Sequence, residues 1–127
     1  MIMKFLIGNS FPLNLIRRPV HIVPETLENL RNMLAAGNWK SFWGHSNTLQ
    51  TVNELTGFDL SPKMERPALS IDEMGFPQLY GESFSVCWIL SAELQNGFRP
   101  SLKSELGRED IIQWRVLRME WEDSCLK

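Results

Sequence analysis

The sequence lacks the short motifs that carry much hydrolase, metal and nucleotide chemistry. Its 127 residues contain no Gly-x-Ser-x-Gly elbow, no His-Glu-x-x-His pair, no Gly-x-Gly-x-x-Gly loop and no P-loop. There are only two histidines, His21 and His45, and they lie too far apart in the sequence to suggest a shared metal site. These absences argue against serine hydrolases of that type, zinc peptidases and the common nucleotide folds, and we expect no metal and no cofactor.

Excess positive charge, long apolar runs and paired cysteines are also missing. The formal net charge is −2, so a duplex nucleic acid is not an expected partner. No apolar run approaches the roughly 20 residues of a membrane span, and the opening MIMKFLIG is too short for a signal peptide. Cys87 stands in an apolar run and Cys125 in the polar tail, so we expect no bridge and a reducing cytoplasm.

What is present indicates one globular α/β domain over residues 1–127, with 122–127 as a frayed tail. Hydrophobic residues make up 43% of the chain and charged residues 22%. Strand-like and helix-like patterns alternate, which predicts a mixed sheet with helices packed on it. The expected extended segments are Ile2–Gly8, Val20–Val23, Trp39–Trp43, Ala68–Ile71, Ser83–Leu90 and Arg115–Trp121. The near-continuous apolar content of SFSVCWIL predicts a strand that is covered on both faces.

Three helices are expected between these strands. Pro24 and Glu25 are typical of a first turn, and the helix that they begin should end at Gly37. The second helix should have Ser46 or Asn47 as its N-cap and should present Leu49, Val52 and Leu55 on one face. The third is expected over Ser101–Gln113.

The segment Trp43–Thr48 is the strongest candidate for a functional site. A glycine, a histidine and three small polar residues precede or begin a helix there. The start of a helix leaves backbone N–H groups unpaired and carries a partial positive charge, so a phosphate can bind to it. The adjacent imidazole of His45 could then transfer a proton, although a lone histidine in such a place can also be purely structural.

Other features allow two interpretations each. Arg17 and Arg18 are either part of a solvated turn or phosphate contacts, and Arg66 is either a surface charge or a ligand contact. The five tryptophans are either core and subunit-interface residues or stacking surfaces for bases. Composition alone does not separate these interpretations.

The run Gly44-His45-Ser46-Asn47-Thr48, with the helical pattern after it, resembles the glycine–histidine helix start of the viral ring nucleases. These are anti-CRISPR proteins directed against type III systems. The run Phe5–Phe11 is similar to the first strand and the Asn-containing loop of that family. The later order of an apolar strand, a short helix and a last strand is also similar. The resemblance covers most of the chain at low identity.

The resemblance implies a small α/β homodimer that binds cyclic tetra-adenylate in a pocket across its interface and cleaves it without a metal. A 2′-hydroxyl of the ring attacks the neighbouring phosphorus, and the family histidine, here His45, protonates the leaving 5′-oxygen. Asn9 and Ser10 in the first loop would contact the ribose or phosphate. Ser46, Asn47 and Thr48 would bind at the helix start, and Arg66 would be the family's phosphate-binding arginine.

Two further family positions, an arginine and a glutamate that complete the site, correspond here to Glu93 and Asn96. An acid in place of an arginine repels phosphate, so three functions remain open. The first is a ring nuclease that counters host antiviral signalling, and the second is a sponge that holds a cyclic nucleotide uncleaved. The third is a protein-binding accessory factor on the same fold.

Overall fold

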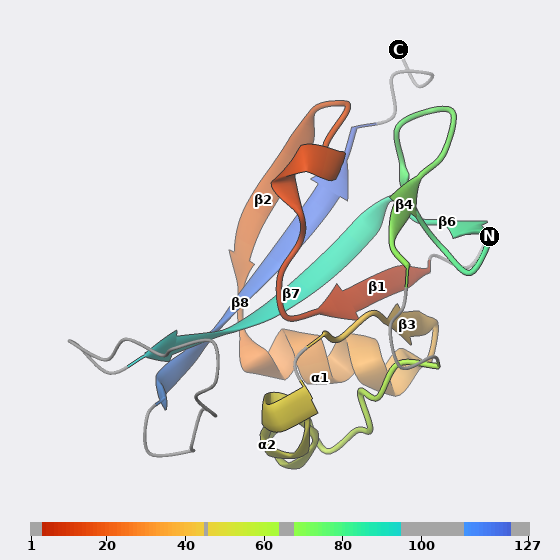
Figure 1. Cartoon of the computed structure of the whole chain (residues 1–127). Helices are drawn as coiled ribbons and strands as arrows, with labels where there is room; N and C mark the ends of the chain where they lie inside the picture. Colours follow the sequence, from red (N-terminus) through yellow and green to blue (C-terminus); the bar gives the residue numbers. More distant parts are fainter. Residues whose placement is uncertain (1–3, 45, 64–67, 95–110, 123–127) are drawn as a thin grey trace.

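A five-stranded mixed β-sheet is the centre of the computed structural model, and two helices pack on it (Figure 1). The structure describes residues 4–44, 46–63, 68–94 and 111–122. The strands of the large sheet are ordered β2-β8-β7-β1-β3, and β4, β5 and β6 form a second, small sheet. This arrangement confirms the expected α/β class, with a mixed sheet and helices packed on it.

The helices are α1 (Leu27–Ala36) and α2 (Ser46–Thr56), and a short 3-10 turn spans Leu13–Leu15. The strands of the large sheet are β1 (Phe5–Gly8), β2 (Val20–Glu25), β3 (Trp39–Ser41), β7 (Val86–Leu94) and β8 (Ile111–Trp121). The small sheet contains β4 (Ser70–Ile71), β5 (Pro77–Leu79) and β6 (Glu82–Ser83).

Strands β7, β1 and β3 run parallel to one another, while β8 and β2 complete the sheet in antiparallel pairs. The carboxyl ends of β1 and β3 therefore meet at one edge, and their amino ends meet at the opposite edge. Figure 1 shows the small sheet beside the amino end of β1 and the start of α2 toward its carboxyl end.

Both faces of the large sheet are covered along β7, as the apolar run in that strand predicts. Val86, Trp88 and Leu90 belong to a core formed with the apolar sides of α1 and α2. Cys87 and Ile89 point into a second core on the other face. That second core is covered by the chain after β1 and by residues in and directly after the small sheet, since it includes Phe11, Leu79 and Phe84.

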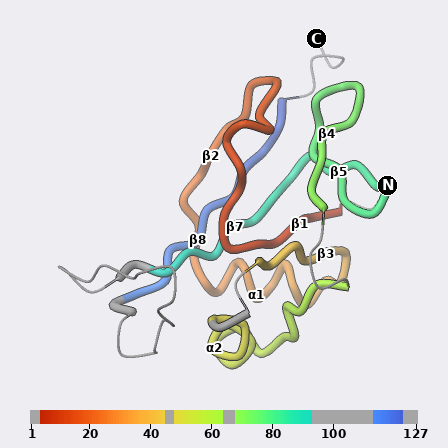
Figure 2. The backbone as a smooth tube through the Cα atoms, viewed as in Figure 1, coloured from red at the N-terminus to blue at the C-terminus, as the bar shows by residue number. Residues whose placement is uncertain are grey.

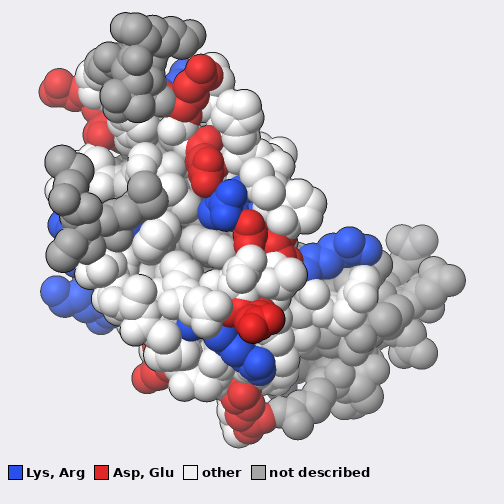
Figure 3. All heavy atoms as spheres, turned by 180° about the vertical axis from the view of Figure 1, so that it is seen from behind, with Lys and Arg blue, Asp and Glu red and all other residues white. Residues whose placement is uncertain are grey.

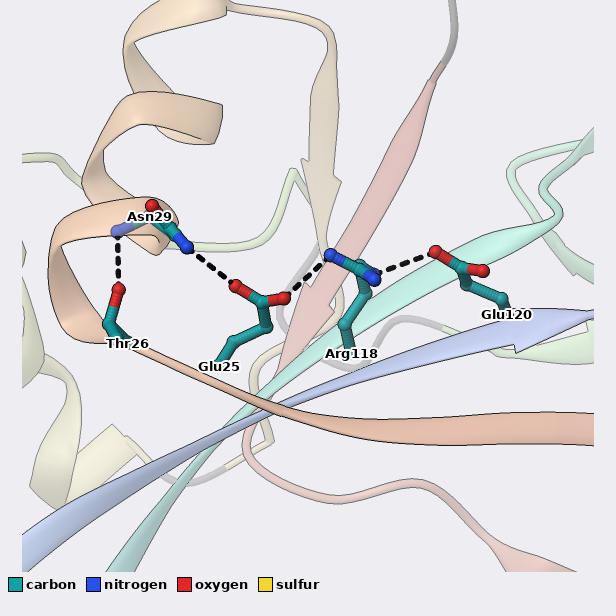
Figure 4. Close-up of polar contacts among 5 residues, drawn as sticks. All are labelled: Glu25, Thr26, Asn29, Arg118 and Glu120. Carbon is teal, nitrogen blue, oxygen red and sulfur yellow. Dashed lines mark hydrogen bonds and ion pairs between the residues drawn. The ribbon is translucent and has the colours of Figure 1, made fainter.

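The first helix begins later than expected, because Pro24 and Glu25 are the last residues of β2. β2 is the outer strand of the sheet, where a residue without an N–H group is tolerated. The N-cap of α1 is Thr26, whose hydroxyl accepts the backbone N–H of Asn29 at 3.0 Å. Glu25 accepts from the Asn29 amide at 2.9 Å and from Arg118 at 2.7 Å, so it joins this helix start to β8 (Figure 4).

The same cluster extends along β8. Arg118 Nε lies 2.7 Å from Glu120 Oε1, and the two groups form an ion pair. The geometry of this contact is not that of a hydrogen bond. Because Arg118 and Glu120 are two residues apart on one strand, their side chains share a face of the sheet. The face in Figure 3 shows acidic and basic side chains interspersed, and its described residues form no continuous basic surface.

Two other boundaries differ from expectation. Ser83 belongs to β6, and the long strand β7 starts only at Val86 and continues to Leu94. Most of the helix expected over Ser101–Gln113 lies outside the described residues. Its last three residues, Ile111–Gln113, belong to β8, because pairing with the extended end of β7 overrides their local helical pattern.

All five tryptophans take part in packing within the chain. Trp43, Trp88 and Trp121 are buried, and Trp39 and Trp114 are half-buried against the core below the helices. This packing accords with the core interpretation of these residues. Cys87 is a free, buried thiol whose pKa is raised by burial. None of the helices in the described part of the chain is long and apolar enough to cross a membrane.

Candidate functional site

The candidate site lies where β1 and β3 end side by side. The two strands pair in parallel, with Phe5 opposite Trp39 and Ile7 opposite Ser41. The pairing continues one residue further, since the Phe42 N–H donates to the Ile7 carbonyl at 2.9 Å. The carboxyl ends of neighbouring parallel strands are where α/β sheets commonly bind ligands. The loop after β1 and the loop from β3 to α2 both begin at this edge (Figure 2).

A hydrogen bond joins these two loops. The side-chain Oδ1 of Asn9 accepts the backbone N–H of Gly44 at 3.0 Å. Asn9 is half-buried, while Gly44 is exposed. The structure thus brings together the first loop and the glycine that precedes His45, which are 35 residues apart in the sequence.

The position of Asn9 is fixed by a close contact beneath it. The ring of Phe42 lies over Gly8, and a Cβ on Gly8 would come within 2.5 Å of that ring. Phe42 meets Phe11 edge-on, with ring centroids 6.4 Å apart, and Phe11 packs against Trp121 at 5.1 Å. Asn9 and Ser10 therefore lie between two anchored residues, and Ser10 is exposed. Apart from the glycine itself, no feature of the sequence indicated this contact.

The start of α2 is also held by hydrogen bonds of Ser41 and Trp43. The Ser41 hydroxyl donates to the Leu60 carbonyl at 2.5 Å and accepts the Trp43 N–H at 3.2 Å. The indole N–H of Trp43 donates to the hydroxyl of Thr48 at 3.2 Å. Ser41, Trp43 and Thr48 are all at most 5% exposed. The hydroxyl of Thr48 is thus a structural acceptor, and the buried Ser41 is a positioning residue that sequence reasoning missed.

Some of the remaining predicted site residues lie in described helices or strands, and the others lie outside the described residues. Helix α2 begins at Ser46, so Ser46 and Asn47 occupy its first turn and not the N-cap position expected for one of them. Glu93 lies in β7. His45, Arg66 and Asn96 lie outside the described residues.

The described residues of the two loops, 9–12 and 42–44, carry no charged side chain. What they offer a ligand is the amide of Asn9, the hydroxyl of Ser10 and backbone groups. Within the described ranges, no three His, Cys, Asp or Glu side chains lie close enough together to hold a metal ion. The local chemistry is that of neutral hydrogen bonding beside the start of a helix.

Arg18, one of the alternative phosphate contacts, has a structural role. Its Nε donates to the Glu122 carbonyl at 2.9 Å and its Nη1 to the Met74 carbonyl at 2.6 Å. Its guanidinium also stacks 4.2 Å from the ring centre of Phe76. Arg18 thereby ties the turn before β5 to the end of β8. The guanidinium of Arg17 donates to the nearby carbonyl of Asn14.

Comparison with known proteins supports the fold. No protein-family model matches the chain, and no curated protein sequence matches it either. Among solved structures, the chain is similar to B116 of Sulfolobus turreted icosahedral virus, with a TM-score of 0.55 and 18% sequence identity. The similarity covers 94% of this chain and 99% of B116. A viral protein therefore shares this fold over nearly its whole length.

Proposed function

We propose that the chain binds a cyclic oligonucleotide, of the cyclic oligoadenylate type, at the carboxyl ends of β1 and β3 and cleaves it without a metal. The observation that carries the proposal is the hydrogen bond from Gly44 to Asn9. It joins the two segments that the ring-nuclease resemblance assigns to one site, and it does so directly beside the start of α2. Neutral donors next to a helix N-terminus suit a phosphodiester.

The chemistry requires few groups. A 2′-hydroxyl of the ring attacks the adjacent phosphorus while the bond to the 5′-oxygen breaks, which leaves a 2′,3′-cyclic phosphate and a 5′-hydroxyl. The attack depends mainly on in-line positioning, to which Asn9 and Ser10 contribute. His45 protonates the departing oxygen, and the 2′-hydroxyl proton passes to solvent. Backbone N–H groups at Asn47 and Thr48 stabilise charge on the phosphoryl oxygens, and Arg66 binds phosphate.

The biological setting follows from the same resemblance and from the fold shared with a virus protein. The chain would be a viral protein that removes a host antiviral signal in the host cytoplasm, as anti-CRISPR ring nucleases do. It would act as a homodimer that binds one ring between two copies of the site.

The test is incubation with a panel of cyclic oligoadenylates in EDTA, followed by chromatography of the products. We expect a linear product from at least one ring, and His45→Ala should slow its formation by about 10²–10⁴-fold, as for loss of a general acid. His21→Ala is the matched control, since His21 is exposed on β2 and should not alter the rate. The absence of linear product from every ring would exclude the nuclease.

A sponge is the second candidate, and Glu93 at the family's arginine position favours it. A sponge would bind a ring tightly in calorimetry and release it intact after denaturation, whereas the nuclease releases linear fragments. If no ring binds, both nucleotide proposals fail. A protein-binding accessory role would then be the remaining hypothesis.

A further inference from the structure

A cavity of about 230 Å³ opens at the other end of the same two strands. It lies where the chain enters β1 and β3, next to the small sheet, and is somewhat smaller than the roughly 300–1,000 Å³ typical of sites for drug-sized ligands. Its lining residues are Lys4, Gly37, Asn38, Trp39, Lys40, Glu82 and Phe84.

The charges of this cavity do not cancel. Lys4 Nζ lies 3.0 Å from one carboxylate oxygen of Glu82, and Lys40 Nζ lies 3.4 Å from the other. Two ammonium groups against one carboxylate leave a surplus positive charge on the lining. The ammonium of Lys63, which lies outside the lining, is 6.0 Å from the ring centre of Tyr80, and that of Lys40 is 5.9 Å from the same ring centre, so Lys63 adds positive charge near the cavity. This positive surplus occurs in a chain whose net charge is −2.

The walls are aromatic and fixed in place. The indole N–H of Trp39 donates to the Leu34 carbonyl at 2.9 Å, which holds the ring against the end of α1. Phe84 is only 3% exposed, and its N–H donates to the Pro77 carbonyl at 2.9 Å. Gly37 ends α1 in the left-handed region, with φ of 86°, and carries no side chain into the opening. Surplus positive charge beside fixed aromatic walls matches a ligand with an anionic group and a flat body.

We propose that this cavity binds a small organic anion, a carboxylate or phosphate attached to an aromatic ring. The anionic group competes with Glu82 for Lys40, whose ion pair is the longer of the two, and the ring packs against Trp39. This site is separate from the proposed nucleotide site, because the two lie at opposite ends of β1 and β3.

The test is a titration of the ¹⁵N-labelled protein, monitored by NMR, with benzoate, adenosine 5′-monophosphate, benzamide and inorganic phosphate. Benzoate, the monophosphate or both should saturate at about millimolar concentration, as befits so small a contact, with shifts at Gly37–Lys40 and the Trp39 indole. Saturation by only one of the two would identify a carboxylate or a phosphate as the ligand's anionic group, and saturation by both would show that the cavity accepts either group. Benzamide lacks the charge and inorganic phosphate lacks the ring, so both should bind about tenfold more weakly.

Two substitutions should change the affinity for the ring-bearing anion in opposite directions. Lys40→Gln should weaken binding about tenfold, as for loss of a charged hydrogen bond. Glu82→Gln should tighten it, since it removes the competing carboxylate and frees both lysines. Arg17→Gln, which changes an exposed charge outside the cavity lining, is the control and should change nothing.

Three results would overturn the proposal. One is the absence of saturable shifts at Gly37–Lys40 with any ring-bearing anion. Another is binding of benzamide or inorganic phosphate as tight as that of the ring-bearing anions. The third is unchanged or weaker binding in Glu82→Gln. Shifts at Asn9 and Gly44 would instead report on the nucleotide site, so the two proposals fail separately.

Discussion

The two ends of β1 and β3 carry opposite kinds of chemistry on one pair of strands. At the carboxyl ends, the described loops present the amide of Asn9 and the hydroxyl of Ser10, and the bond from Gly44 to Asn9 joins the two loops. At the amino ends, Lys4 and Lys40 surround Glu82 beside aromatic walls. Backbone geometry determines the arrangement of polar groups at the carboxyl ends, whereas charged side chains determine it at the amino ends.

This difference determines which substitutions should damage each end. Backbone donors are placed by packing, so the carboxyl end should fail when the packing beneath it changes. Ammonium and carboxylate groups on long, partly exposed side chains adapt more easily, so the amino end should respond to changes of charge and pH. The following predictions test that contrast, from the largest expected effect to the smallest.

Gly8→Ala should damage the carboxyl end most. The new methyl group would meet the buried Phe42 ring, which Phe11 packs against from its edge. Overpacking of this kind typically costs about 1–3 kcal/mol in the free energy of unfolding, which urea denaturation followed by tryptophan fluorescence would measure.

Gly44→Ala is the matched control for Gly8→Ala. A Cβ there would lie 3.7 Å from Asn9 Oδ1, an ordinary contact, so stability should change little. Benzoate binding at the amino end should survive both substitutions. Equal stability of the two variants would show that the Phe42 contact does not position the Asn9 loop.

Much of the fold could be predicted from the sequence, because local patterns dominate there. The apolar run of β7 and the glycine at the end of α1 correctly indicated a strand covered on both faces and a helix stop. The start of α1 could not be predicted, because Pro24 is typical of the first turn of a helix. It belongs to a strand because β2 lies at the edge of the sheet, and the order of strands cannot be read from the local sequence. Ile111–Gln113 were misassigned for the same reason, because their pairing with β7 is non-local.

The site was predictable in its parts but not in its assembly. Asn9 and the Gly44 turn were each identified as candidates, yet their contact depends on the register between β1 and β3. The buried hydroxyl of Ser41 has no signature in the sequence. The amino-end cavity was not anticipated, because Lys4, Lys40 and Glu82 are distant in the chain and only the folded protein brings their side chains together.

Two substitutions of Asn9 distinguish the effect of losing its hydrogen bond to Gly44 from the effect of adding a negative charge at the carboxyl end. Asn9→Ala removes the acceptor for the Gly44 N–H and should cost about 1 kcal/mol of stability. Asn9→Asp keeps an acceptor, so stability should stay near that of the parent chain. The added negative charge should nevertheless weaken binding of cyclic tetra-adenylate about tenfold in calorimetry.

Asn14→Asp is the control for Asn9→Asp, since Asn14 is exposed in the 3-10 turn and lies outside both loops. It adds the same charge and should leave binding unchanged. If both aspartate variants bind equally well, Asn9 does not face the anion. If Asn9→Ala is as stable as the parent chain, the bond to Gly44 does not hold the two loops together.

The smallest expected effect is a pH dependence at the amino end. The hydrogen bond from Lys4 lowers the pKa of Glu82 below its ordinary value of 4.5, partial burial opposes this shift, and Lys40 lowers the pKa further. A lowered pKa in the folded state means that the ion pairs contribute stability above about pH 4.5 and lose it as the pH falls through the pKa of the folded protein. The carboxyl carbon of Glu82, followed by ¹³C NMR, should therefore titrate with a midpoint below 4.5.

The two lysines provide a matched pair for this titration. Lys4→Gln should raise the midpoint of Glu82 more than Lys40→Gln does, because the Lys4 ammonium is closer to the carboxylate, at 3.0 Å against 3.4 Å. The looser partner, Lys40, is also the one that the proposed anion would take from Glu82. Saturating adenosine 5′-monophosphate, whose phosphate keeps a negative charge at this pH, should therefore raise the Glu82 midpoint in the parent chain toward that of Lys40→Gln. A larger shift in Lys40→Gln than in Lys4→Gln would reverse the order of the two ion pairs, and the incoming anion would then have to displace Glu82 from its stronger partner.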